Sequence, residues 1–171
     1  MRIIISDSSC LIDLHKAGLL EAIFDLPFSY AIPQPLFDEE LLSISDDEKA
    51  MLVEAGMDVT VLPGEHVVLA QTYYNDNRRL KLNDCFALVL AETTEDAILF
   101  TGDNPLRQLS ESKEIETHGV LWAIDQMLEH TNIDPQLLLD ALLLYERDPL
   151  VRLPDGELRK RIRRLKKMAE G

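Results

Sequence analysis

Three aspartates stand where the sequence predicts that acidic side chains are buried. Asp7 and Asp103 each follow an apolar run that is typical of a strand, and Asp84 directly precedes the apolar segment 85–91. In a parallel α/β sheet, functional groups collect beyond the carboxyl ends of the strands. Burying unpaired carboxylates near one another costs several kcal/mol each, or raises their pKa values until they protonate.

Each of these acids also has an ordinary structural explanation. Asp7 and Asp84 could cap the helices that they begin, and Asp103 stands in a Gly-Asp-Asn-Pro turn. Salt bridges cannot neutralise all the acids, because seven of the 17 Lys and Arg residues lie in 159–171 and only ten precede them. A divalent cation held by oxygen ligands would offset the charge. The sequence therefore indicates a metal site and leaves helix capping open.

A fourth acid is expected from the helix that begins at Pro33 and Pro35. Glu39 and Glu40 follow Leu36 by three and four residues, so either one can share the face that Leu36 turns to the core. Adjacent helical residues point about 100° apart, so only one of the two can face the other acids. Geometry alone does not decide between them, and we prefer Glu39.

The charge of the chain is unevenly distributed. The formal net charge is −14, from 17 basic and 31 acidic residues, although the segment 159–171 is strongly basic. An acidic body repels a polyanion unless bound cations or a basic tail reverse the sign locally. Arg107, in the helix after Asp103, is placed to meet a phosphate or to pair with an acid. In the last helix, the candidate nucleic-acid contacts are Arg159, Arg163 and Lys166. The alternatives are that the apolar stripe of this helix, Leu158, Ile162, Leu165 and Met168, docks on the domain, or that its bases bind an acidic groove of a partner.

Strand-like runs that alternate with helical stretches predict an α/β fold with a mostly parallel sheet. The expected strands are 2–6, 28–32, 59–62, 97–101 and 115–118. The expected helices are 9–17, one that begins at 33–35, 46–56, 65–74, 84–95 with Asn83 as its N-cap, 105–112 and 120–130. A Leu-rich helix over 134–145 and a basic helix over 155–168 follow, so we expect a domain at 1–130 and a helical extension at 131–171.

Composition excludes several classes of protein. The longest apolar run, 85–91, is far shorter than the roughly 18 residues that cross a bilayer, and the N-terminus turns acidic too early for a signal peptide. Cys10 and Cys85 show no metal-binding spacing, so a reduced, cytoplasmic protein is expected. The four histidines also lack such spacing and are interpreted as surface or structural residues, and Trp122 is interpreted as core.

The order of these motifs resembles the PIN-domain family. The motifs are Asp7-x-Ser9, Pro33-x-x-Leu36-x-x-Glu39, Asp84 at the head of an apolar helix, and Leu99-Phe100-Thr101-Gly102-Asp103-x-x-Leu106-Arg107. The resemblance covers about residues 1–130. It implies a three-layer α/β domain with a central, mostly parallel sheet flanked by helices.

The resemblance also implies an activity. Carried onto the matching positions, it makes Asp7, Glu39, Asp84 and Asp103 the ligands of Mg²⁺ or Mn²⁺. The hydroxyls of Ser9 and Thr101 would hold a water or a neighbouring carboxylate. Many members are ribonucleases that cut single strands, and small members are similar to VapC toxins paired with an antitoxin.

We therefore expect a metal-dependent endoribonuclease acting on single-stranded RNA. An antitoxin and a second copy of the chain are its expected protein partners, and no membrane is expected. The alternative is a non-catalytic PIN-like module that binds protein or RNA, in which the helical extension carries the function.

Overall fold

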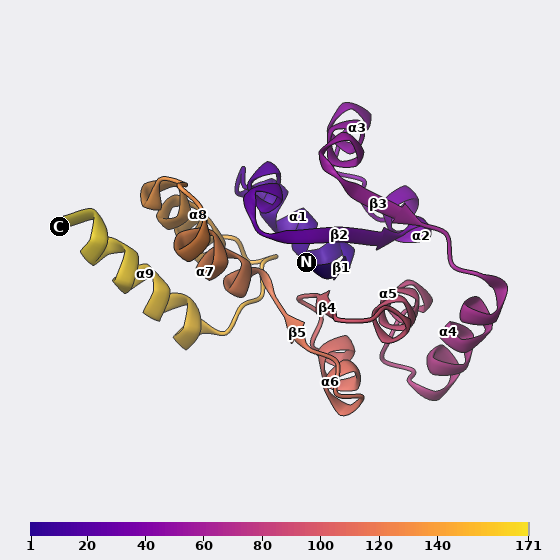
Figure 1. Cartoon of the computed structure of the whole chain (residues 1–171). Helices are drawn as coiled ribbons and strands as arrows, with labels where there is room; N and C mark the ends of the chain where they lie inside the picture. The colour runs from indigo at the N-terminus through magenta and orange to yellow at the C-terminus, as the bar shows by residue number, and fades with distance from the viewer. Residues whose placement is uncertain (171) are drawn as a thin grey trace.

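The computed structural model describes residues 1–170, and a sheet of five parallel strands lies at its centre (Figure 1). The strands are β1 (Arg2–Ser6), β2 (Phe28–Pro33), β3 (Met57–Thr60), β4 (Ala97–Phe100) and β5 (Thr117–His118). Their order across the sheet is β3-β2-β1-β4-β5, so the direction of winding reverses between β1 and β4. The carboxyl ends of the strands at such a reversal open a crevice where α/β proteins bind ligands. The predicted parallel sheet is confirmed.

Helices flank the sheet, as the prediction of a three-layer α/β fold requires. They are α1 (Ser8–Lys16), α2 (Gln34–Glu39), α3 (Asp46–Ala55), α4 (Gly64–Asp76), α5 (Leu82–Thr93), α6 (Asn104–Ser112), α7 (Val120–His130), α8 (Pro135–Arg147), α9 (Asp155–Glu170) and the short 3₁₀ helix η1 (Glu21–Asp25). Helix α5 packs against β1, β2 and β4, and α4 packs against α5. Within residues 1–170, no helix is both long enough and apolar enough to span a membrane.

The two central strands are buried because helices cover the sheet. Ile4, Ile5, Ile98 and Leu99 are almost fully buried, and so is the whole apolar segment 85–91 of α5. This explains why the strands read as continuous apolar runs and not as alternating patterns. It also means that the residues that follow these strands begin at the edge of the core.

Two local expectations were wrong. Strand β3 begins at Met57, two residues before the expected start, because Gly56 ends α3 at φ 122° and the chain enters the sheet at once. Asn83 was expected to cap α5, but the N-cap is Lys81, and Asn83 lies within the first turn. The carboxylate of Asp84 accepts a hydrogen bond of 2.9 Å from the backbone N–H of Lys81, which fixes the start of the helix two residues earlier.

The helical extension packs on the α/β domain through α7. Helices α8 and α9 lie side by side at one end of the molecule, and α4 lies at the other (Figure 1). Leu158, Ile162 and Leu165 form the buried stripe of α9 that its sequence predicted, while Met168 is exposed. Arg161 of α9 donates two hydrogen bonds, of 2.9 and 2.8 Å, to the carboxylate of Asp125 on α7. Gly171, the last residue of the expected extension, lies outside the described residues, and the boundary near residue 130 stays a prediction.

Candidate active site

Asp7 lies at the carboxyl end of β1 and is the N-cap of α1, with 3% of its surface exposed. Its Oδ1 accepts a hydrogen bond from the backbone N–H of Ser8 at 2.9 Å. Its Oδ2 accepts two more, from the hydroxyls of Thr101 at 2.7 Å and Ser9 at 3.1 Å. Three donors thus fix the orientation of a buried carboxylate at the point where the strand order reverses.

Asp103 lies at the end of the neighbouring strand β4 and is the N-cap of α6. Its carboxylate accepts a hydrogen bond of 3.1 Å from the backbone N–H of Leu106. The hydroxyl of Thr101 accepts from the backbone N–H of Asp103 at 3.1 Å while it donates to Asp7. Ser9 makes a matching link, because its hydroxyl accepts from the backbone N–H of Gly102 at 3.0 Å. The two hydroxyls therefore join the loops that carry Asp7 and Asp103.

Asp84 comes from the first turn of α5, on a different part of the chain. Burial raises the pKa of Asp84, against the hydrogen bond from Lys81, and the negative charges of Asp103 and Glu40 raise it further. Asp84 is therefore electrostatically coupled to two other acids of the site.

The buried Asp7 carboxyl is the most strongly perturbed acid of the site. Its pKa rises from 3.8 to about 7, first because burial removes it from water. The hydrogen bond from Thr101 opposes this rise, and the charges of Asp84 and Glu40 add to it. The carboxylates of Asp7, Glu40, Asp84 and Asp103 therefore interact electrostatically as one cluster, because the charge of Asp84 acts on Asp7 and that of Asp103 acts on Asp84.

Glu40, and not Glu39, is the glutamate that the structure brings to these acids. Its Oε1 accepts a hydrogen bond from the hydroxyl of Ser8, and its Oε2 accepts one of 2.9 Å from the side-chain amide of Asn83. Glu39 is exposed and has only a long contact of 3.5 Å with the same amide. Helix α2 ends at Glu39, and the N–H of Glu40 still bonds to the carbonyl of Leu36 at 3.0 Å. Glu40 therefore lies one full turn after the buried Leu36 and on the same side of the helix, where its carboxylate contacts Ser8 and Asn83.

Sequence reasoning missed Ser8 and Asn83, which hold Glu40. Each is adjacent to an acid of the site, Ser8 to Asp7 and Asn83 to Asp84. This adjacency to a predicted metal ligand was the sequence signal that could have identified both residues. For Asn83 it was overlooked, because Asn83 was interpreted as the N-cap of α5.

The predicted cationic residues are divided between two regions. Arg107 lines a cavity together with Ser9 and Asp103, and its Nε lies 3.9 Å from Glu111 Oε1. Arg159 and Arg163 border a separate hollow, together with Glu146 of α8. Neither these two arginines nor the exposed Lys166 lines the cavity that Arg107 shares with Asp103.

The chemistry of these oxygen donors fits a hard divalent cation. Within residues 1–170, none of the four coupled acids forms an ion pair, although the positive charge of Lys81 lowers the pKa of Asp84 in part. In that same range, no group of three or more His, Cys, Asp or Glu side chains is gathered closely enough to hold a metal ion in the present arrangement. The fit therefore rests on the type of donor and on the mutual repulsion of the acids, and binding would require their side chains to move closer together.

The parallel sheet makes this an α/β protein, and the acids beyond the carboxyl ends of β1 and β4, where the strand order reverses, form its candidate active site. A family model for the PIN domain matches residues 3–167, and the chain therefore belongs to the PIN-domain family. The match extends beyond the resemblance at 1–130 and includes α8 and most of α9. PIN domains are in general nucleases and in general use divalent metal ions. A search of curated proteins found no match to the chain.

Proposed function

We propose that the protein is a metal-dependent endoribonuclease that cuts single-stranded RNA. In this proposal Asp7, Glu40, Asp84 and Asp103 hold Mg²⁺ or Mn²⁺. The observation that supports it best is the carboxylate of Asp7, which is buried, fixed by three donors and surrounded by acids instead of bases. A buried carboxylate costs stability unless a positive charge compensates it. The antitoxin and the homodimer stay predictions from the resemblance.

The residues of the site have distinct roles in this proposal. A bound divalent cation would polarise the scissile phosphate and lower the pKa of the attacking water. Thr101 and Ser9 hold the carboxylate of Asp7 in one orientation, and Thr101 also fixes the loop that carries Asp103. Arg107, on the first turns of α6, meets a phosphate of the strand beside the acids.

Helix N-termini offset a small part of the repulsion among the acids. Asp7 and Asp103 are the N-caps of α1 and α6, and Asp84 is in the first turn of α5. The partial positive charge of a helix N-terminus stabilises a nearby carboxylate by about 0.3–1 kcal/mol. The same positions therefore explain the capping that the sequence suggested and offset a small part of the repulsion among the acids.

The proposal predicts that the purified chain cuts single-stranded RNA only with a divalent ion. A panel of unstructured RNAs should give defined fragments in Mn²⁺ or Mg²⁺, because the acids require a cation to bring the phosphate to them. EDTA should abolish the fragments, and excess Mn²⁺ should restore them. Fully paired duplexes of the same sequences are the matched control and should stay intact. An uncut panel in Mn²⁺, with any bound antitoxin removed, would contradict the proposal.

A second candidate is the non-catalytic binding module. The observation in its favour is that the carboxylates of Asp84 and Asp103 each accept a backbone hydrogen bond, from Lys81 and Leu106, and are thus also explained as caps. Calorimetric titration with Mn²⁺ separates the candidates. The module predicts no heat of binding and no Mn²⁺-dependent rise in melting temperature, whereas a ligand that binds the native state raises it.

A further inference from the structure

A cavity of about 600 Å³ opens beside the acid cluster, between the α/β domain and the extension. Ser9, Thr101 and Asp103 line one end of it, so it is continuous with the candidate active site. Another part of its lining comes from the connection between α8 and α9, at Arg152 and Leu153. The volume falls within the roughly 300–1,000 Å³ typical of pockets for small ligands.

We infer that this cavity binds one nucleotide of the substrate strand, next to the phosphate that is cut. The base would pack on the aromatic wall of the cavity, and the phosphate would face its basic side chains. This inference rests on the proposed function, and it assigns to the extension a part in recognising the strand.

The aromatic wall consists of His118 and Trp122. Their rings are stacked, with centroids 4.4 Å apart and planes inclined by 6°, and both residues line the cavity. Ile12 and Leu153 add apolar surface to the same cavity. Nucleic-acid-binding proteins use such surfaces for bases, since every base has a flat π-face that packs on an aromatic ring.

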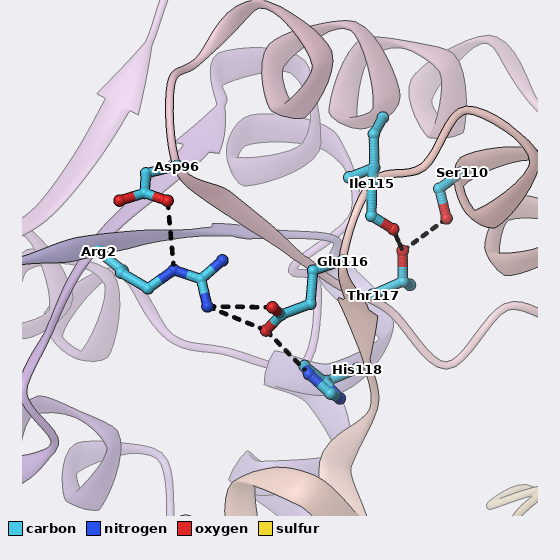
Figure 2. Close-up of polar contacts among 7 residues, drawn as sticks. All are labelled: Arg2, Asp96, Ser110, Ile115, Glu116, Thr117 and His118. Atoms are coloured by element: carbon cyan, nitrogen blue, oxygen red, sulfur yellow. Dashed lines mark hydrogen bonds and ion pairs between the residues drawn. The ribbon is translucent and has the colours of Figure 1, made fainter.

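A chain of polar contacts holds the His118 ring in place. Its Nε2 lies 3.0 Å from Glu116 Oε2, and Glu116 in turn accepts hydrogen bonds of 3.0 and 3.1 Å from Arg2 Nη1 (Figure 2). Arg2 also forms an ion pair with Asp96 at 3.8 Å. A ring fixed both by stacking and by a hydrogen bond loses little freedom when a base packs on it.

The lining of the cavity balances basic and acidic side chains, whereas the body of the protein is acidic. Four bases line it, Lys16, Arg107, Arg152 and Arg161, together with four acids, Asp13, Asp103, Asp125 and Glu157. Arg152 is exposed and forms no ion pair within residues 1–170, whereas Arg161, also on the wall, is held by Asp125. Phosphate contacts need positive side chains without a fixed sequence pattern, and Arg107 and Arg152 meet that need.

The test uses Trp122, the only tryptophan of the chain, as a fluorescent reporter. The full-length Asp84→Asn protein is titrated in Mg²⁺ with short single-stranded oligoribonucleotides, because Asp84 does not line the cavity and the proposed function predicts that its replacement prevents cleavage. We expect Trp122 fluorescence to change on binding. His118→Ala in this background should weaken binding roughly tenfold to hundredfold, as expected for the loss of one stacked base. His118→Phe, which keeps an aromatic ring, should restore most of the affinity.

Arg152→Ala and Arg159→Ala form the matched pair for the phosphate contact. Both arginines are exposed, but only Arg152 lines the cavity. We expect Arg152→Ala to weaken binding. It should also reduce the slope of the logarithm of the binding constant against the logarithm of the salt concentration by about one, the value for one lost phosphate contact. Arg159→Ala should have a smaller effect on both. Melting temperatures measured in parallel show that each variant is folded.

The outcomes separate this inference from the proposed function. The inference is overturned if Trp122 does not respond to RNA up to millimolar concentration, or if His118→Ala binds as well as its parent. RNA cleavage by the unmodified chain in Mn²⁺ would then still support the nuclease. Conversely, a Trp122 response that depends on His118, without cleavage by the unmodified chain, would support the cavity and contradict the nuclease.

Discussion

Asp7→Asn is expected to lower the rate of RNA cleavage strongly and, at the same time, to stabilise the protein in the absence of metal. A cation that polarises the phosphate contributes several kcal/mol to catalysis, so losing its central ligand should lower the rate roughly a hundredfold to thousandfold. The gain in stability follows from burial. Asp7 is 3% exposed and lies beside other acids, and an uncharged amide of the same shape avoids that cost.

The stability effect depends on pH in a defined direction. The folded chain holds a proton on Asp7 up to pH about 7, whereas the unfolded chain releases it near 3.8. Below about pH 4 both states are protonated, and the difference vanishes; the folded state loses stability as the pH rises from about 4 to about 7, and the loss is complete above pH 7. The full pKa difference corresponds to about 4 kcal/mol. The observed gain should be smaller, about 1–3 kcal/mol, because the amide nitrogen cannot accept the hydrogen bonds from Thr101 and Ser9.

Denaturant unfolding in EDTA, from about pH 5 to pH 8, measures this effect. The free energy of unfolding of the unmodified chain should fall relative to that of Asp7→Asn as the pH rises. Asp58→Asn, at an exposed position of β3, is the control and should change neither stability nor cleavage. Cleavage by Asp7→Asn at the normal rate, or a variant that is less stable above pH 7, would contradict the assignment.

The second large effect is expected from a pair of neighbouring glutamates. Glu40→Gln should weaken Mn²⁺ binding roughly tenfold to hundredfold, because this carboxylate is coupled to Asp7 and Asp84. Glu39→Gln should leave the affinity within roughly twofold, as is usual for an exposed side chain away from the site. The two changes are chemically identical and one residue apart, so they differ only in where the side chain lies.

Calorimetric titration with Mn²⁺ and RNA cleavage rates should rank the two variants in the same order. Equal losses of Mn²⁺ affinity in both variants would contradict the assignment of Glu40, and not Glu39, as the metal ligand. A larger loss for Glu39→Gln would restore the sequence-based preference and would require a different path for the end of α2.

Periodicity and strand ends predicted much of the fold. The apolar runs of β1 and β4 indicated strands buried on both faces, and parallel strands place the residues after them at one edge of the sheet. This is why Asp7 and Asp103 were expected together, and the structure brings their loops together through Thr101 and Ser9.

Details that depend on contacts between distant segments escaped prediction. The choice between Glu39 and Glu40 depends on where α2 ends and on Asn83, which is 43 residues away from Glu40. The cavity escaped as well, because the stacking of His118 on Trp122 depends on how α7 leaves β5. Local sequence shows neither the direction of a helix end nor the packing of one element on another.

The central claim is that a divalent cation binds among the four coupled acids. Anomalous diffraction from crystals of the full chain soaked in MnCl₂ tests it most directly. We predict one or two manganese peaks bounded by the carboxylates of Asp7, Glu40, Asp84 and Asp103. Manganese found only at other positions, or no peak at a concentration that saturates binding in solution, would contradict the account.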